Sequence, residues 1–115
     1  MNQLLKKSDL SSEELGQLLQ ARSEGKVDFV LIDVREDMEY RMGRLKGVDL
    51  LKPTSTFQSW AEELFEETKD KTVILTCRTG NRSGQVQAVF TRNGHPHVIN
   101  HAGGIVSYRG EIEKG

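Results

Sequence analysis

The chain has 115 residues, 36% of them hydrophobic and 29% charged, with a formal net charge of −1, which suits one soluble globular domain with a modest core. The near-zero charge and the scattered lysines and arginines argue against nucleic acid or an anionic membrane surface as a partner. The sequence contains no apolar run of signal-peptide or membrane-spanning length, so we expect a cytoplasmic domain over residues 1–115.

The chain begins with a predicted helix and a predicted strand. Ser11 and Glu14 form a capping-box pattern, and leucines on one helical face follow, which predicts a helix over residues 11–22. Residues 27–34 are a nearly continuous apolar run. Such a run is typical of a strand that is buried on both faces of a sheet.

Two further helices are predicted between residues 35 and 69. In the short helix over residues 35–42, Arg35 and Glu39 stand at i and i+4, where opposite charges are able to pair. Residues 54–69 show the clearest helical periodicity in the chain. The apolar positions of that helix are Phe57, Trp60, Ala61, Leu64 and Phe65.

The second half repeats the alternation of strand and helix. It predicts a buried strand over residues 71–77, a helix over 83–94, a short strand over 97–100, and a glycine turn with a last helix over 103–115. Strands that alternate with helices favour an α/β fold with a mainly parallel central sheet and helices on both faces.

Cys77 is the only cysteine of the chain. An internal disulfide, a resolving cysteine and a cysteine-rich zinc site are therefore excluded, and whatever Cys77 acquires must pass to an external molecule. His95, His97 and His101 crowd one short stretch, but no carboxylate lies among them. We therefore expect no metal ion and interpret the three as exposed imidazoles in an edge loop.

The loop after the second buried strand combines a thiol, two arginines and small residues. Its members are Cys77, Arg78, Thr79, Gly80, Asn81, Arg82 and Ser83. A loop that curls at the carboxyl end of a strand points backbone N–H groups inward, and the following helix adds positive charge, so the loop is predicted to cradle an anion. Gly80 permits a positive φ, Asn81 tolerates one, and Ser83 suits the N-cap or first turn of the helix.

The natural anion at the centre of this loop is the Cys77 thiolate, because helix N-termini and arginines lower the pKa of a cysteine. Cys77 is therefore predicted to be a nucleophile that needs no histidine base. The alternative is an inert core thiol, but two arginines and a glycine within five residues favour the nucleophile. Arg78 and Arg82 are either anion ligands or solvated charges, and the second interpretation suits Arg78 better.

These residues resemble the active-site loop of the rhodanese (sulfurtransferase) family, Cys-Arg-x-Gly-x-Arg, which residues 77–82 match. Three further motifs of that family are matched in the same order by "DVREDMEY", "MGRLKGV" and "AGGIVSY". The resemblance is strongest over residues 27–108. The chain departs from the family motifs at Arg44, Val48, His101 and Tyr108.

The resemblance implies a rhodanese-like three-layer domain and a two-step sulfur transfer. The Cys77 thiolate attacks the sulfane sulfur of thiosulfate or a polysulfide, becomes a persulfide, and passes the outer sulfur to cyanide, a thiol or a partner protein. Arg78 and Arg82 are implied to bind the anionic donor. No cofactor is implied, and Asp33 and Arg35 are expected to stabilise the fold.

Two other functions stay open. The first is a persulfide carrier or partner-binding module, whose partner would dock around Cys77; such modules typically lose the cysteine or the glycine–arginine loop, and this chain keeps both. The second is a cysteine phosphatase on the same fold. Phosphatase loops read Cys-x5-Arg, whereas Arg82 comes one residue earlier. We expect small-molecule sulfur donors and acceptors as the main partners.

Overall fold

A parallel sheet forms the centre of the computed structural model, which describes residues 3–115. Within those residues the sheet has five strands in the order β1-β6-β5-β2-β4, all paired in parallel. The strands are β1 Asp9–Leu10, β2 Val30–Asp33, β4 Leu50–Leu51, β5 Val73–Thr76 and β6 Val98–His101. The predicted α/β fold with a mainly parallel sheet is confirmed.

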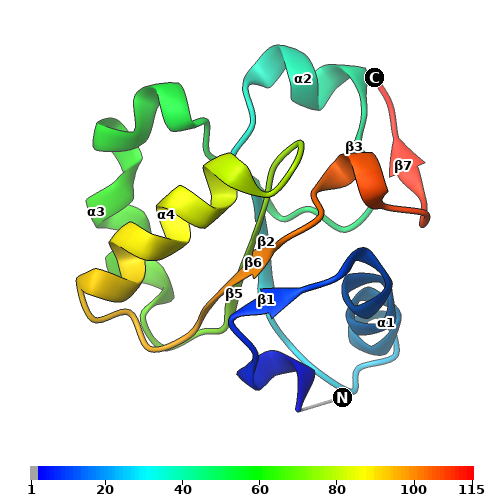
Figure 1. Cartoon of the computed structure of the whole chain (residues 1–115), viewed down its shortest axis with the longest axis horizontal. Helices are drawn as coiled ribbons and strands as arrows, with labels where there is room; N and C mark the ends of the chain where they lie inside the picture. Colours follow the sequence, from blue (N-terminus) through cyan, green and yellow to red (C-terminus); the bar gives the residue numbers. More distant parts are fainter. Residues whose placement is uncertain (1–2) are drawn as a thin grey trace.

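Helices cover both faces of this sheet (Figure 1). The α-helices are α1 Ser12–Ser23, α2 Asp37–Met42, α3 Phe57–Thr68 and α4 Asn81–Arg92. One-turn 3-10 helices are η1 Leu4–Lys6, η2 Thr54–Thr56 and η3 Ile105–Ser107, and β3 Arg44–Leu45 pairs antiparallel with β7 Ile112–Glu113. In Figure 1, α3 and α4 lie on one side of the strands, α1 lies on the other, and α2 lies beyond their carboxyl ends.

The N-terminus of α1 has the predicted capping box. The Ser11 hydroxyl accepts a hydrogen bond from the Glu14 amide at 3.1 Å, and the Glu14 carboxylate accepts one from the Ser11 amide at 2.9 Å. Two amides that the helix leaves without internal partners are thereby satisfied. The helix then buries Leu15 and Leu18 against the sheet.

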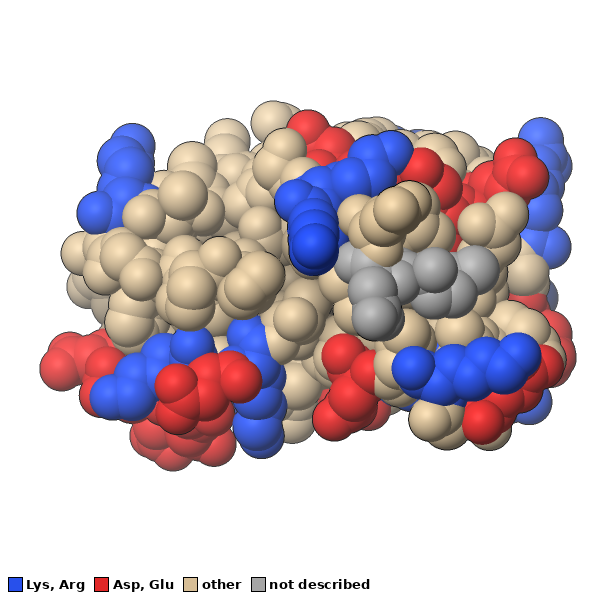
Figure 2. All heavy atoms as spheres, turned by 90° about the horizontal axis from the view of Figure 1, so that it is seen from below, with Lys and Arg blue, Asp and Glu red and all other residues tan. Residues whose placement is uncertain are grey.

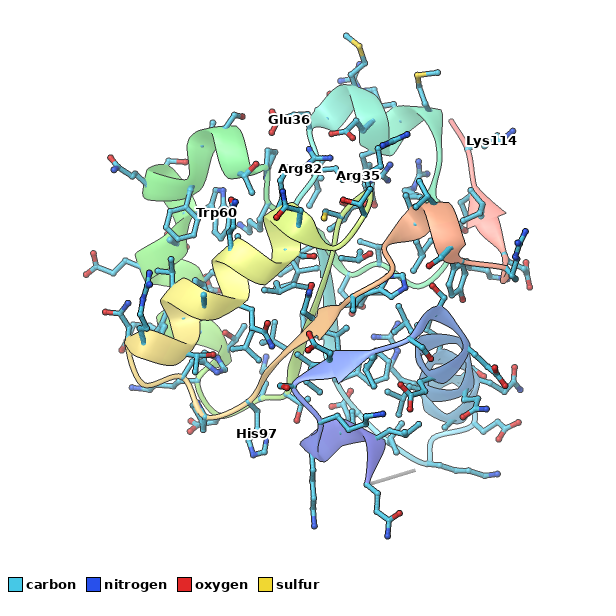
Figure 3. The ribbon with its side chains drawn as sticks, viewed as in Figure 1. Arg35, Glu36, Trp60, Arg82, His97 and Lys114 are labelled. Atoms are coloured by element: carbon cyan, nitrogen blue, oxygen red, sulfur yellow. The ribbon has the colours of Figure 1, made fainter. Side chains whose placement is uncertain are left out.

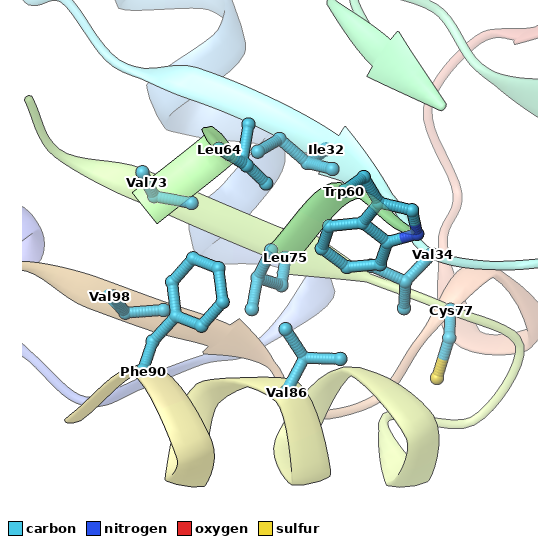
Figure 4. Close-up of a cluster of buried hydrophobic side chains, with 10 residues drawn as sticks. All are labelled: Ile32, Val34, Trp60, Leu64, Val73, Leu75, Cys77, Val86, Phe90 and Val98. Atoms are coloured by element: carbon cyan, nitrogen blue, oxygen red, sulfur yellow. The ribbon is translucent and has the colours of Figure 1, made fainter. Parts of the chain in front are cut away.

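Strand β5 divides the hydrophobic core into two layers, because its side chains alternate between the two faces of the sheet. Val73, Leu75 and Cys77 join the cluster beneath α3 and α4, together with Trp60 and Phe90 (Figure 4). On the opposite face, a second cluster packs beneath α1. Its buried members are Leu10, Leu15, Leu18, Phe29, Leu31, Leu45, Ile74 and Ile99. Cys77 thus closes the α3–α4 layer at the carboxyl end of the sheet.

The strand register brings polar residues together at that end. Asp33 lies opposite Thr76 in the β2–β5 pair, and Leu75 lies opposite Asn100 in the β5–β6 pair. Asp33, Thr76 and Asn100 are all buried. The residues that follow these strands therefore meet at one edge of the sheet, where parallel α/β folds bind their ligands.

The predicted pairing of Arg35 with the Glu39 side chain is wrong. The Arg35 guanidinium binds the buried carboxylate of Asp33 through Nε at 3.1 Å and Nη2 at 2.9 Å, and it contacts Glu39 only at the backbone oxygen. A carboxylate buried without a partner is costly, so Asp33 takes the guanidinium. The expectation that Asp33 and Arg35 stabilise the fold agrees with this buried ion pair.

The predicted last helix is also wrong. Only the single turn η3 forms, because the Ile105 and Val106 amides donate to the oxygens of Cys77 and Arg78 at 2.9 and 3.1 Å. The chain leaves helical geometry at Tyr108, whose φ of −80° and ψ of 131° are extended, and β7 then pairs with β3. The end of the chain therefore supports the cysteine loop.

The face on the lower side of the molecule as drawn in Figure 1 carries charges of both signs. Figure 2 shows lysine and arginine side chains interspersed with acidic ones on this face. Within residues 3–115, every helix is too short or too polar to cross a bilayer.

Candidate active site

The thiol of Cys77 lies between the end of β5 and the start of α4. Figure 4 shows its sulfur directed toward the first turn of α4. The residue is 1% exposed, and it packs with Val34 and Val86 in the α3–α4 layer. Burial of this degree also suits an inert core thiol, so the polar contacts of the sulfur decide between the two interpretations.

Three hydrogen-bond donors converge on Cys77 Sγ. The Gly80 amide lies at 3.1 Å, the Ser83 amide at 3.4 Å and the Ser83 hydroxyl at 3.3 Å. Burial raises the pKa of the thiol, but the Ser83 hydroxyl and the amides of Ser83, Thr79 and Gly80 lower it, and the net pKa is below the ordinary value. These contacts favour the predicted anion cradle over the inert thiol.

Two glycines let the loop close around the sulfur. Gly80 has φ +94°, and a Cβ there would collide with the backbone of Ala102. Gly104 has φ +67°, and a Cβ there would collide with the backbone of Arg78. Backbone therefore packs directly on backbone on both sides of the loop, as only glycine permits.

The remaining small residues of the loop occupy the first turn of α4 or the surface. Ser83 was predicted at either the N-cap or the first turn of the helix. Gly80 is the N-cap residue, so Ser83 lies in the first turn. Asn81 begins the helix and does not use a positive φ, since all positive-φ residues among those described are glycines. Thr79 is exposed.

The two loop arginines differ in their environment. Arg78 is exposed, and its side chain has no ion-pair partner within the described residues. Arg82 forms a two-pronged contact with Glu39 of α2, Nη1 to Oε1 at 2.7 Å and Nη2 to Oε2 at 2.9 Å. The hydrogen bonds from Arg82 lower the pKa of Glu39 to about 2, and Glu39 in turn raises the pKa of Arg82. Arg82 is therefore held in place, whereas Arg78 has the exposed position that the solvated-charge interpretation predicts.

The sequence interpretation missed Asn100 of β6, which contacts the loop from the side. Its Oδ1 accepts from the Ser83 hydroxyl at 2.6 Å, and its Nδ2 donates to the Gly80 oxygen at 3.1 Å. Asn100 therefore holds two of the residues that donate to the sulfur. An asparagine in a short strand carries no signal of this role, because its contacts depend on strand order.

The interpretation of the three histidines as exposed is wrong for two of them. His97 is exposed, but His95 is 4% and His101 0% exposed. The His101 ring lies 2.8 Å from Thr76 Oγ1 and 2.7 Å from Ser12 Oγ. Burial lowers the pKa of His101 to about 4, so the ring is neutral at physiological pH.

Arg44, where the sequence departs from its motif, stacks on Tyr40. Its guanidinium carbon lies 4.7 Å from the ring centre, and Nη1 donates to the Tyr40 oxygen at 3.2 Å. Both contacts are with the end of α2. Among residues 3–115, no cluster of three histidine, cysteine, aspartate or glutamate side chains is arranged to hold a metal ion.

Comparison with known proteins identifies the family to which this fold belongs. The family model for the rhodanese-like domain matches residues 14–111. The tRNA uridine(34) hydroxylase of Cronobacter sakazakii is 34% identical over 84 residues, covering 70% of this chain and 24% of the relative. The tRNA uridine(34) hydroxylase of Escherichia fergusonii is 30% identical over 107 residues, which cover 87% of this chain and 30% of the relative. The chain thus spans only about a quarter to a third of these relatives.

Solved structures share the fold. A rhodanese-like domain protein from Staphylococcus aureus superposes with a TM-score of 0.71 at 23% identity, covering 95% of this chain and 99% of that one. A rhodanese with anions from E. coli superposes with a TM-score of 0.62 at 26% identity, covering 76% and 100%. Because the family model matches most of this chain, the chain belongs to the rhodanese-like domain family.

Proposed function

We propose that this chain is a sulfurtransferase in which Cys77 carries sulfane sulfur as a persulfide. The observation that supports this most is the convergence of the Gly80 amide, the Ser83 amide and the Ser83 hydroxyl on the sulfur at 3.1–3.4 Å. These donors stabilise a negative charge on Sγ without a histidine base.

The first step loads the cysteine. The Cys77 thiolate attacks the outer sulfur of thiosulfate, a new S–S bond forms on Sγ, and the old S–S bond breaks with its electron pair leaving on sulfite. Arg78 meets the anionic donor at the surface, while Arg82 adds a positive charge from its fixed position beside Glu39. Because Cys77 is 1% exposed, side chains at the mouth must shift to admit the donor.

The second step unloads it. A thiophilic acceptor, cyanide in an assay or a thiol in the cell, attacks the outer sulfur. The S–S bond to Cys77 breaks with its electron pair remaining on Sγ, and the thiolate is restored. The route is ping-pong, because the first product leaves before the acceptor reacts.

A protein acceptor has support from one further observation. Met38 and Met42 of α2 are each 75% exposed, and Val106 of η3 is 58% exposed. Because α2 binds Arg82 through Glu39 and η3 binds the Cys77 oxygen, these apolar side chains belong to the elements around the loop. A persulfide carrier with one dedicated partner is therefore the second candidate function.

The relatives named tRNA uridine(34) hydroxylase raise an RNA nucleoside as another class of substrate. This chain has a net charge of −1 and mixes both signs on the face of Figure 2, so we propose a small-molecule or protein acceptor instead. The phosphatase alternative is disfavoured because Arg82 lies five residues after Cys77 and is bound to a carboxylate.

The test is steady-state turnover of thiosulfate and cyanide to thiocyanate and sulfite. We expect ping-pong kinetics and complete loss of turnover in Cys77→Ser, with unchanged circular dichroism. Matched assays with an aryl phosphate and with tRNA address the other classes. Turnover of the phosphate, or thiocyanate formation by Cys77→Ser at the wild-type rate, would overturn the proposal.

A further inference from the structure

The Ser83 hydroxyl lies between two hydrogen-bond acceptors. Its oxygen is 3.3 Å from Cys77 Sγ and 2.6 Å from Asn100 Oδ1. Ser83 is 0% and Asn100 7% exposed, so bulk water does not replace either partner. A hydroxyl carries one proton, and it donates to only one of these acceptors at a time.

Which acceptor is favoured depends on the charge of the sulfur. A neutral Cys77 thiol has its own proton and is able to donate it to Ser83 Oγ, while the hydroxyl donates to Asn100 at the shorter distance. A thiolate has no proton and is a charged acceptor, and hydrogen bonds to charged acceptors are roughly twice as strong as neutral ones. The hydroxyl then gains by turning to Sγ.

The Asn100 amide is fixed in the orientation that keeps its oxygen toward Ser83. Its Nδ2 donates to the Gly80 oxygen at 3.1 Å, and a flipped amide would place an oxygen against that oxygen. Its position beside α4 is tight, because a Cβ on Gly84 would come within 3.3 Å of Nδ2. Asn100 is thus a permanent alternative acceptor for the hydroxyl.

We propose that the Ser83 hydroxyl is a two-position donor that bonds Asn100 while Cys77 is a thiol or a persulfide and turns to Sγ whenever Sγ carries the negative charge. The Ser83 proton stays on Oγ and only the hydroxyl torsion rotates; the proton that Cys77 loses when it becomes a thiolate goes to solvent. Asn100 is a positioning residue that accepts the hydrogen bond of the Ser83 hydroxyl while Sγ carries no negative charge.

The persulfide part of this inference rests on the proposed sulfur transfer. In the loaded state the charge lies on the outer sulfur, and Sγ is an uncharged bridging atom. When the acceptor takes the outer sulfur, the S–S electron pair returns to Sγ. The hydroxyl then stabilises Sγ as a leaving group, which favours the unloading step.

Other charged and titratable groups around the sulfur stay constant in this switch. Arg82 of α4 is bound to Glu39 of α2, and Arg78 is exposed on the loop. Glu36, before α2, also acts on Arg82. On the other face of β6, His101 is neutral at physiological pH. The variants below alter none of these groups.

The test is a double-mutant cycle with Ser83→Ala, Asn100→Leu and the double variant. The measured quantity is the apparent pKa of Cys77, from the pH dependence of thiolate ultraviolet absorbance, which needs no reagent to reach the sulfur. We expect Ser83→Ala to raise the pKa by about one unit, which is a tenfold change in the thiolate-to-thiol ratio at a fixed pH. We also expect the shift caused by Asn100→Leu to differ at least about threefold, as a thiolate-to-thiol ratio, between the two backgrounds.

The cycle separates the switch from structural damage. Any effect of Asn100→Leu through Gly80 is present in both backgrounds and cancels. An unchanged pKa in Ser83→Ala, or the same Asn100→Leu shift in both backgrounds, would overturn the switch. Asn100→Ala replaces Asn100→Leu if the latter does not fold. The matched control is Thr68→Val, which removes a buried hydroxyl bonded to His95 at the opposite end of the sheet and should leave the Cys77 pKa unchanged.

The persulfide part has its own readout. With persulfide-loaded protein, we expect Ser83→Ala to slow sulfur release to cyanide about tenfold, and an unchanged rate would overturn the leaving-group role. The two proposals fail separately. If the double-mutant cycle shows coupling but no persulfide forms, the sulfurtransferase proposal fails and the hydroxyl switch stands. If a persulfide forms but the cycle shows no coupling, the switch fails and the sulfurtransferase proposal stands.

Discussion

The two ends of the central sheet differ in how their polar groups are held. At the carboxyl end, buried polar side chains from neighbouring strands all have partners: Asp33 binds Arg35, Thr76 binds His101, and Asn100 binds Ser83. At the amino end, a groove of about 540 Å³ is lined by basic and apolar side chains, including Lys6, Lys7 and Arg92, and by His97. Figure 3 shows Arg35 and Arg82 at the first end and His97 at the second.

This difference indicates that the size of a hollow does not mark the site in this molecule. The lining of the open groove at the amino end includes no cysteine, whereas the carboxyl end encloses Cys77 almost completely. A reactive thiolate needs fixed donors and a rigid support more than it needs open space. The following predictions alter one end and compare it with the other or with the exposed surface.

The largest effect on stability is expected from the buried ion pair at the carboxyl end. Asp33→Asn leaves the Arg35 guanidinium buried without its carboxylate, which should lower the free energy of unfolding by about 3–5 kcal/mol in urea titrations. The matched control is Asp37→Asn. The side chains of its ion pair are exposed, Arg41 by 75% and Asp37 by 56%, so the pair should contribute less than about 1 kcal/mol to the free energy of unfolding. Equal losses in the two variants would show that the buried ion pair does not stabilise the fold more than the exposed pair does.

Acid should weaken the fold through His101. Its folded pKa of about 4 lies below the ordinary value of 6.5, so the unfolded chain binds a proton first as the pH falls. The free energy of unfolding should therefore drop by about 3 kcal/mol between pH 6.5 and about 4 from this residue alone. His101→Gln should flatten that slope, while His97→Gln, at an exposed position, should not. Parallel slopes for wild type and His101→Gln would rule out this role.

A smaller effect, on activity, is expected from Arg82. Arg82→Ala removes a fixed positive charge beside the sulfur and should lower kcat/KM for thiosulfate about tenfold. The same variant should change stability by less than about 1 kcal/mol, because its ion pair with Glu39 is partly exposed. Arg92→Ala, at the amino end, provides the control. Unchanged donor kinetics in Arg82→Ala would remove Arg82 from donor binding.

The smallest effect is expected in the groove at the amino end. Lys6→Glu combined with His97→Glu cancels the formal positive charge of its lining, which comes from Lys6, Lys7 and Arg92. Thiocyanate formation should stay within about twofold of wild type, because the groove is remote from the sulfur and exposed charges are screened. A larger loss would show that the amino end takes part in the reaction.

The elements that position Cys77 were predictable from local patterns. The apolar runs that became β2 and β5, the capping box of α1 and the helical periodicity of α3 each depend on neighbours within a few residues. The donors around the Cys77 sulfur were predictable for the same reason, since Cys77, Gly80 and Ser83 lie within seven residues of one another. Strand order then brings this loop to the ligand-binding edge of the sheet.

The contacts that hold the loop from outside were not predictable. The i, i+4 spacing makes Glu39 a possible partner of Arg35, but the buried Asp33 binds that guanidinium and Glu39 binds Arg82, 43 residues away. Asn100 contacts Ser83 only because β6 lies beside β5. Long-range hydrogen bonds of this kind follow from the whole fold and leave no periodic signal.

The error at the chain end has the same origin. The segment after Gly104 has helical character over one turn, and its Ile105 and Val106 amides then bond the oxygens of the cysteine loop. A local pattern does not show that those oxygens need donors. The two glycines, whose conformations were open from sequence alone, are required because loop and chain end pack backbone against backbone.

The measurement to make first is the intact mass of the protein after incubation with thiosulfate or polysulfide, and again after cyanide. We predict a gain of one sulfur atom, about 32 Da, which cyanide removes and which Cys77→Ser does not show. A folded protein that forms a thiolate yet gains no sulfur from either donor would contradict the persulfide on Cys77.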